Sequence, residues 1–242
     1  MIQRYFIVTV LLVLSVSAFA QNETEQILNK AKQLHEKGQF KEAIKLYSDA
    51  IKLNTENADA YYYRGNAWYD QNDFDKAIKD YSSCVKVDKN YLDAWFNMGN
   101  AWYEKDNFKE AAKDFTIIVE KDPKYSDALL LRGNCYFKLK EFQNAINDFN
   151  KVIKLDPKNS DVFYDRANAY FSIENFTQAL IDYDQAIELN ATASYYFFNR
   201  AITKFNLQIE DEGCKDLQMA KKLGDSDAEY YLNELCGQSP IE

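Results

Sequence analysis

Side chains able to carry out catalysis are scarce in this chain of 242 residues. It has one histidine, His35, and therefore no pair with the His-x-x-x-His or Glu-x-x-His spacing that holds zinc on a helix. Serine and cysteine nucleophiles need a nearby base, and His35 is the only imidazole present. No glycine-rich phosphate loop occurs either. We therefore predict that the chain is not an enzyme and needs no metal or cofactor.

Carboxylates are numerous, but they recur at a fixed interval. Asp59, Asp93, Asp127 and Asp161 are spaced 34 residues apart. A catalytic acid–base pair would occur once, whereas recurrence is what a surface built from repeats produces. The 38 acidic and 29 basic residues give a net charge of −9, with no basic cluster or stripe. This composition argues against nucleic-acid binding and against attachment to a membrane surface.

The interval of 34 residues defines the elements that must position these side chains. Residues 92–125 show the pattern best. Its landmarks are Trp95, Met98, Gly99, Trp102, Ala111, Phe115 and Pro123. The first four lie on one face of a helix, the small residues let two antiparallel helices approach, and the proline stops the second helix. The segment therefore predicts a helical hairpin.

This pattern resembles the tetratricopeptide repeat (TPR), which reads W-x2-L-G-x2-Y followed by Ala, an aromatic residue and Pro. Met98 replaces Leu and Trp102 replaces Tyr, and both keep the size and apolar character. Six such segments follow one another in phase, the first and last being the least regular. They are residues 24–57, 58–91, 92–125, 126–159, 160–193 and 194–227.

A single hairpin of this kind cannot bury its apolar face alone, so repeats must stack. The resemblance implies an all-α fold, a right-handed α-solenoid of six helix-turn-helix repeats over residues 24–236. Residues 227–236 are predicted to form a C-terminal capping helix.

Residues 1–20 have the features of a secretory signal. Arg4 precedes an uncharged run that ends Ala18-Phe19-Ala20, the small-x-small pattern of a cleavage site. The run is shorter than the roughly 20 residues that span a bilayer. We expect cleavage before Gln21, no stable membrane span afterwards, and export to the periplasm of a bacterium or outside the cell. An uncleaved membrane anchor is the alternative.

Export would place the four cysteines where thiols oxidise. Cys214 lies near the start of the second helix of the sixth repeat, and Cys236 ends the capping helix. Since those two helices should run antiparallel, we predict a disulfide between Cys214 and Cys236. Cys84 and Cys135 occupy small-residue packing positions and are expected to be buried free thiols.

Arginine recurs at position 7 of four repeats, and aspartate recurs at position 23 of the same repeats. The predicted structural ion pairs are Arg64 with Asp80, Arg132 with Asp148, Arg166 with Asp182, and Arg200 with Asp216. A guanidinium on a packing face needs a partner, because its desolvation is otherwise costly. The third repeat has Asp114 but carries Met98 in place of the arginine.

The opposite face of each first helix, at positions 2, 5, 9 and 12, forms a ladder of acid, aromatic or apolar, amide and aromatic side chains. In TPR proteins this face lines a concave groove that binds peptides. The ladder comprises Asp59, Tyr62, Asn66, Tyr69, Asp93, Phe96, Asn100, Tyr103, Asp127, Leu130, Asn134, Phe137, Asp161, Tyr164, Asn168 and Phe171. An amide can pair with a peptide backbone, and aromatic rings supply contact area. The acidic rim favours an apolar segment with Lys or Arg.

The resemblance thus implies a non-catalytic scaffold or adaptor, which binds a protein or peptide partner in an exported compartment. Two alternatives stay open. The chain could be a structural spacer of an envelope assembly with no peptide groove in use, since asparagine at position 9 and an aromatic residue at position 12 also occur in generic repeats. It could also bind a glycan or small ligand on the aromatic ladder. The clamp that holds the acidic tails of chaperones is not expected, because Asp, Tyr and Phe stand at its positions.

Overall fold

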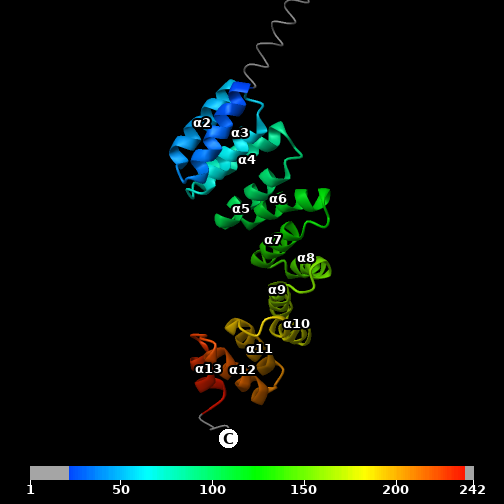
Figure 1. The fold of residues 1–242 in the computed structure, drawn as a ribbon. Helices are drawn as coiled ribbons and strands as arrows, with labels where there is room; N and C mark the ends of the chain where they lie inside the picture. Colours follow the sequence, from blue (N-terminus) through cyan, green and yellow to red (C-terminus); the bar gives the residue numbers. More distant parts are fainter. Residues whose placement is uncertain (1–21, 238–242) are drawn as a thin grey trace, which may run out of the picture. The chain divides into compact units, whose positions relative to one another are not determined.

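The computed structural model describes residues 22–237, and the regular secondary structure in that range is entirely helical (Figure 1). The predicted signal at residues 1–20 falls outside the described residues. Residues 22–36 are helical and precede the labelled helices. These are α2 (Phe40–Leu53), α3 (Ala58–Tyr69), α4 (Phe74–Val87), α5 (Leu92–Glu104), α6 (Phe108–Lys121), α7 (Ser126–Lys138), α8 (Phe142–Leu155), α9 (Ser160–Ser172), α10 (Phe176–Leu189), α11 (Ser194–Asn206), α12 (Glu210–Lys222) and α13 (Ala228–Leu235). The predicted all-α solenoid of helical hairpins is confirmed.

None of the described helices combines the length and the apolar character that crossing a bilayer requires.

Each hairpin turns through a residue with left-handed backbone geometry that lies just after its first helix. These residues are Gly38, Asn72, Asp106, Lys140, Glu174 and Gln208, with φ between +56° and +74°. Glycine, asparagine and aspartate adopt this conformation at little cost, which explains the first three turns. In the last three repeats the packing of the two helices imposes it on ordinary residues.

Glycine in the first helix permits the close approach of the two helices. A Cβ atom on Gly65 would lie 2.6 Å from the ring of Tyr81, and one on Gly133 would lie 2.6 Å from the ring of Phe149. Both rings are completely buried at the centre of their hairpins. Any larger residue at these two positions must push the aromatic ring out of its place.

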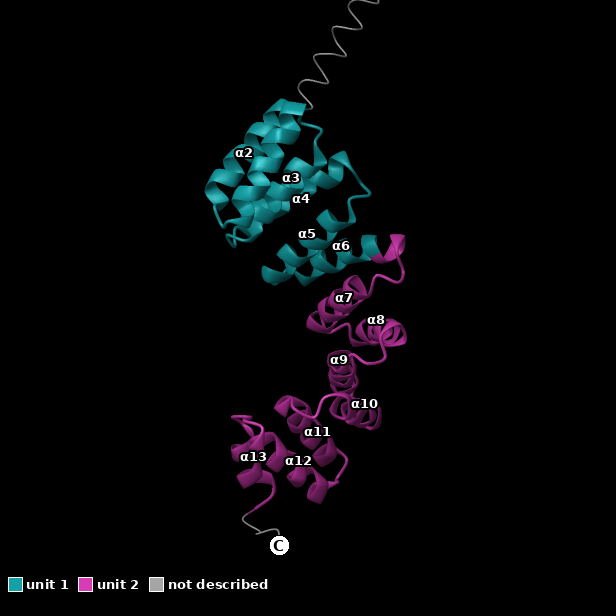
Figure 2. Cartoon of the chain, viewed as in Figure 1, with its two compact units in different colours: residues 1–118 teal, residues 119–242 magenta. Residues whose placement is uncertain are grey.

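The chain divides into two compact units, residues 1–118 (unit 1) and residues 119–242 (unit 2), with the boundary inside α6 (Figure 2). Each unit has its own buried side chains. In unit 1 they centre on Tyr47 and Tyr81. In unit 2 they centre on Tyr183, and α13 closes the last hairpin by packing Ala228 against Phe197 and Ala220.

A bidentate ion pair joins the two helices of four hairpins. In unit 1, Arg64 Nε and Nη2 each lie 2.7 Å from the carboxylate oxygens of Asp80. In unit 2, Arg132 donates to Asp148 over 2.6 and 2.7 Å. The structure likewise joins Arg166 to Asp182 and Arg200 to Asp216. In the sixth repeat Lys204 adds a further bond to Asp216, 2.9 Å long.

In three of these pairs the remaining guanidinium nitrogen reaches the preceding hairpin, from Arg64, Arg166 and Arg200. Arg64 Nη1 donates to Ser48 Oγ over 3.0 Å, and Arg200 Nη1 donates to Asp184 over 2.7 Å. The arginine therefore fixes both its own hairpin and the hairpin before it. Such fork-shaped, charge-assisted bonds constrain geometry as well as contributing energy.

Asp114 of unit 1 lacks the partner that the other hairpins supply. It is 7% exposed, and its Oδ2 atom has no hydrogen-bond partner. Met98, which is also buried, stands where those hairpins have arginine. Burial raises the pKa of the Asp114 carboxyl to about 7; Glu110 raises it further, and Lys113 lowers it. The third repeat thus buries a carboxyl group that is costly to ionise.

The substitution Asp148→Ala should lower the free energy of unfolding by about 3–5 kcal/mol, because it leaves the buried Arg132 guanidinium without its counter-ion. Urea denaturation measures this loss. Asp127→Ala is the matched control, since Asp127 is an exposed aspartate of the same repeat and should change stability little. Equal stabilities of the two variants would mean that solvent, not Asp148, satisfies Arg132.

Asp114 should make the protein less stable as the pH rises. Its pKa is near 7 in the folded state and about 3.9 when unfolded, so between those values the folded state binds the extra proton. We expect the unfolding free energy to fall by about 4 kcal/mol across this window relative to Asp114→Asn. Urea melts from acid to neutral pH test this, with Asp93→Asn as the exposed control. Parallel pH profiles for wild type and Asp114→Asn would contradict it.

Candidate partner-binding face

The predicted ladder lies on the first helices of four repeats, α3 and α5 in unit 1 and α7 and α9 in unit 2. Its side chains do not form a uniform series. Some are occupied by contacts within the chain, and others are left with no polar partner. The occupied side chains belong mainly to the second and fifth repeats, and the side chains without a partner belong to the third and fourth.

The aromatic side chains at position 12 pack against the phenylalanine that opens the second helix of the same hairpin. In unit 1 the ring of Tyr103 meets Phe108 edge-on, with ring centroids 5.1 Å apart. In unit 2, Phe137 meets Phe142 in the same way at 5.4 Å. The pairs Tyr69–Phe74 and Phe171–Phe176 repeat this geometry. One edge of each ring therefore packs within its own hairpin, while the rings stay partly exposed, and their role as ligand anchors stays a prediction.

The single histidine occupies the same place in the first repeat. His35 packs edge-on against Phe40 at 5.3 Å, and its Nε2 atom lies 2.6 Å from Asp70 Oδ2. Asp70 follows α3, so the contact links the first repeat to the second. His35 therefore has a structural place in the fold.

A buried polar network fills the ladder of the second repeat in unit 1. Asn66 Oδ1 accepts hydrogen bonds from the Tyr81 hydroxyl over 2.8 Å and from Asn97 Nδ2 over 2.9 Å. Asn97 also approaches the Tyr62 hydroxyl at 3.3 Å. Burial raises the pKa of Tyr81 above its usual range, so its hydroxyl stays protonated and donates. The oxygen of Asn66 is thus engaged within the fold.

Unit 2 has a similar network at the fifth repeat. The Tyr183 hydroxyl donates to Asn168 Oδ1 over 2.6 Å, and Asn199 Nδ2 donates to the Tyr164 hydroxyl over 2.6 Å. Sequence reasoning missed Asn97 and Asn199, which lie at position 6 of the next repeat. The signal that could have found them is the joint presence of tyrosine at positions 5 and 24 of the second and fifth repeats.

Two of the four aspartates at position 2 accept tyrosine hydroxyls. Asp59 accepts from Tyr91 over 2.8 Å, and Asp161 accepts from Tyr196 over 2.5 Å. Burial and the bond to Asp59 raise the pKa of the Tyr91 hydroxyl above its usual range. Asp59 and Asp161 thus also hold neighbouring repeats together, and the negative rim of four aspartates stays a prediction.

The third and fourth repeats differ, because phenylalanine replaces tyrosine at position 24. Phe115 and Phe149 have no hydroxyl to offer to Asn100 and Asn134. Both amides are partly exposed, and among residues 22–237 neither side chain has a hydrogen-bond partner. At position 5 these repeats carry the apolar residues Phe96 and Leu130. Their ladders therefore combine an apolar side chain with an unsatisfied amide.

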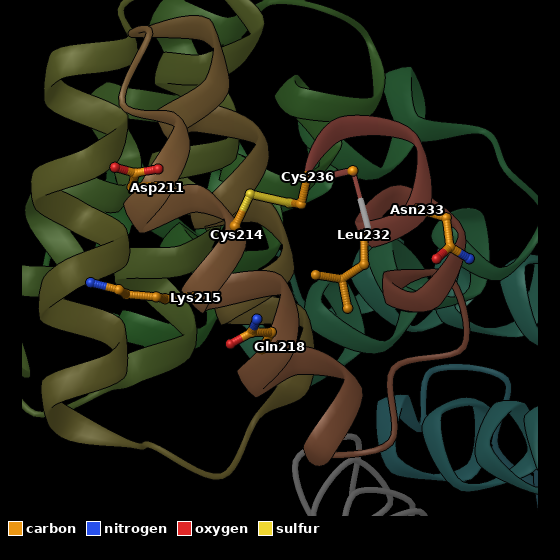
Figure 3. A pocket seen from close by; sticks show the side chains of 8 residues that line it. Asp211, Cys214, Lys215, Gln218, Leu232, Asn233 and Cys236 are labelled. Carbon is orange, nitrogen blue, oxygen red and sulfur yellow. A yellow bond between two sulfur atoms is a disulfide. The ribbon is translucent and has the colours of Figure 1, made fainter. Parts of the chain in front are cut away.

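A pocket of about 420 Å³ lies between α12 and α13 at the C-terminal end of unit 2 (Figure 3). The disulfide between Cys214 and Cys236 forms part of its wall, with Cα atoms 5.8 Å apart.

Cys84 and Cys135 are buried free thiols, and burial raises the pKa of each to about 12. Within the described part of the chain, no group of three or more His, Cys, Asp or Glu side chains could hold a metal ion.

Stacked helical hairpins without catalytic groups define a class of scaffold whose surfaces serve for binding. Models of the tetratricopeptide repeat match residues 58–91, 92–125, 126–159 and 149–181, and a TPR repeat model matches residues 31–71. The chain belongs to the tetratricopeptide repeat family, whose members generally mediate protein–protein interactions and typically are not enzymes.

Solved structures share the fold. YrrB, a TPR protein with an unusual peptide-binding site, is 18% identical, with a TM-score of 0.69 over 78% of this chain and 98% of its own. MamA is 21% identical, with a TM-score of 0.67 over 72% and 94%. PilF of Pseudomonas aeruginosa is 15% identical, with a TM-score of 0.67 over 91% and 99%. At these identities the likeness concerns the fold alone. No curated protein sequence matches the chain.

In the protein unfolded without reductant, we expect two reactive thiols, from Cys84 and Cys135. The double variant Cys214→Ala/Cys236→Ala should be about 3 kcal/mol less stable than wild type, since the disulfide closes a loop of 22 residues. Thiol labelling followed by mass measurement and urea denaturation provide the two readouts. Four labelled thiols in the unreduced wild type would rule out the bond.

Proposed function

We propose that the chain is an exported, non-catalytic scaffold that binds a segment of a partner protein on the first-helix faces of its third and fourth repeats. The observation that carries this proposal is the unsatisfied amide on each face, Asn100 on α5 in unit 1 and Asn134 on α7 in unit 2. The face of α5 and the face of α7 are separate contacts, one in each unit. Binding of protein partners is also what the family generally does.

The chemistry of these faces favours an extended or helical segment that is largely apolar. A side-chain amide can donate to and accept from a peptide backbone, and Phe96 and Leu130 lie one helical turn before the two amides. A partner backbone that pairs with both the oxygen and the nitrogen of such an amide gains two directed hydrogen bonds.

The charge of these faces favours basic residues in the partner. Asp93 and Asp127, on α5 and α7, are exposed and take no part in an ion pair or side-chain hydrogen bond within residues 22–237. The chain as a whole has a net charge of −9. Association should therefore be faster at low ionic strength.

Export is part of the proposal and rests on two observations. Residues 1–20 have the pattern of a secretory signal, and the pairing of Cys214 with Cys236 suits an oxidising compartment. Intact-mass measurement of the protein from its native source tests it. We expect a chain that begins at Gln21, and a mass that retains residues 1–20 would favour a membrane anchor instead.

A structural spacer is the second candidate. The observation that favours it is that the second and fifth repeats use their ladder amides and aspartates for bonds within the chain. A spacer needs no open polar group on its first helices. The unsatisfied amides of the third and fourth repeats are what separates the two functions.

Two sets of asparagine variants test the binding function. Asn100→Ala and Asn134→Ala should each weaken partner binding by about 1–3 kcal/mol, and they should leave stability nearly unchanged because neither amide has a partner in the chain. Asn66→Ala and Asn168→Ala should lower stability and leave partner binding nearly unchanged, since they remove the acceptor of a buried tyrosine hydroxyl.

The partner is first captured by pull-down from an envelope extract, and its affinity for each variant is then measured by titration. Urea denaturation gives stability. Undiminished binding by the double variant Asn100→Ala/Asn134→Ala would place the contact on the convex face or the loops and would overturn the proposal.

A further inference from the structure

We propose that α7 and α9 of unit 2 form a specific acceptor for a basic side chain of the partner, built from Asp165 and Asn134. The inference rests on the proposed function and names the chemistry of one contact. It predicts that the bound segment presents a lysine or arginine to this place.

The position of the two residues follows from the register of the repeats. Asn134 and Asp165 are 31 residues apart, as are Asn66 and Asn97 of unit 1, whose side chains hydrogen-bond over 2.9 Å. The helices correspond as well, because α3 contacts α5 and α7 contacts α9. A carboxylate thus replaces the amide at one of two positions that meet in unit 1.

The groups that satisfy the equivalent side chains elsewhere are missing here. In unit 1 the Tyr62 and Tyr81 hydroxyls complete the network. The corresponding residues in the fourth repeat are Leu130 and Phe149, which are apolar. Two hydroxyl groups are lost, and a carboxylate is introduced. The junction therefore lacks the donors that its polar groups require.

Asp165 has no counter-ion within residues 22–237. It is partly buried, and among the described residues its side chain takes part in no ion pair or hydrogen bond. Burial, and to a smaller extent the negative charge of Asp161, raise the pKa of Asp165 to about 7. The other titratable groups that interact with it are tyrosines, Tyr164 of α9, Tyr183 of α10 and Tyr195 of α11. The arginine of α7, Arg132, is paired with Asp148.

A basic side chain is the ligand that fits this arrangement. An ammonium or guanidinium group would pair with the Asp165 carboxylate in a partly desolvated place, where a charge-assisted hydrogen bond is strong. It can donate a second bond to Asn134 Oδ1. A neutral donor would leave the carboxylate charge without compensation. One carboxylate and one amide supply too few ligands for a divalent cation.

The test uses the full chain and an array of short peptides of randomised sequence, printed in matched sets with lysine, arginine or norleucine at the central residue. For sets that bind, wild type should prefer the lysine or arginine member by roughly tenfold. Asp165→Asn, which keeps the shape and removes the charge, should abolish the preference and retain norleucine binding. Glu188→Gln, which removes an exposed carboxylate of α10 outside the first helices, is the matched control and should keep the preference.

The outcomes separate this inference from the proposed function. If Asn100→Ala/Asn134→Ala weakens peptide binding but Asp165→Asn leaves the preference for a basic residue unchanged, the acceptor is overturned and the scaffold function stands. If the asparagine variant binds all peptides as wild type does, the proposed face itself is wrong. A loss of preference in both Glu188→Gln and Asp165→Asn would indicate long-range charge and would also overturn the acceptor.

A second measurement does not depend on a peptide. The carboxyl carbon-13 resonance of Asp165, assigned by its absence in Asp165→Asn, reports the titration of the group. Adding n-butylammonium, which has the chemistry of the end of a lysine side chain, should lower its titration midpoint by about one pH unit relative to the same concentration of sodium. An unchanged midpoint would contradict the acceptor even if no peptide binds.

Discussion

The stacking of this chain depends on a charged group placed where helices pack. An arginine on the packing face of a first helix cannot remain without a partner, and the bidentate bond to an aspartate of the second helix satisfies it in a single orientation. The remaining guanidinium nitrogen then determines where the preceding hairpin lies, as Arg64 does with Ser48. We infer that the pairs set the angle between helices more than they add stability, since a buried ion pair gains little over an apolar contact but is costly to break.

The same dependence explains each unsatisfied polar group in the described residues. The repeat encodes polar residues in pairs, and replacing one member leaves the other without its partner. Asp114 has lost its arginine to Met98, and its Oδ2 atom is buried without a bond. The hydroxyl of Tyr47, completely buried, has lost its asparagine because Lys32 stands at position 9 of the first repeat. The amides of Asn100 and Asn134 are the reverse case, since their tyrosine has become phenylalanine.

Much of this arrangement could be predicted from the sequence, and the failures have a common cause. The helical hairpins follow from apolar periodicity and turn residues, which act within one repeat. The partners of Arg132 or Arg166 follow from residue type, because a guanidinium at a packing face needs a carboxylate. The ladder was not predictable in the same way. Whether Asn66 or Asn100 is free to bind a ligand depends on the residue at position 24 of its own repeat and on the residue at position 6 of the next repeat. The outcome therefore depends on three helices and not on one repeat pattern. The contact of rings such as Tyr103 with a phenylalanine at the start of the next helix was likewise not predicted, because it depends on how the hairpin closes.

At each ladder, polar side chains that pair within the fold add stability but are then less available to a ligand. Satisfying Asn168 with Tyr183 and Tyr164 with Asn199 stabilises the fifth repeat and leaves less for a ligand. The fourth repeat lacks both tyrosine hydroxyls, and Asp165 follows in the next repeat. Its ladder is therefore less stabilised and remains available to a ligand. A partly buried carboxylate without a counter-ion destabilises the unbound chain, and a partner that supplies a cation recovers that loss on binding. Because the ion pair between Arg132 and Asp148 holds α7 and α8 in place independently of this face, the fourth repeat can tolerate the loss. Specificity for a basic segment then follows from the polar groups that the fold leaves without partners.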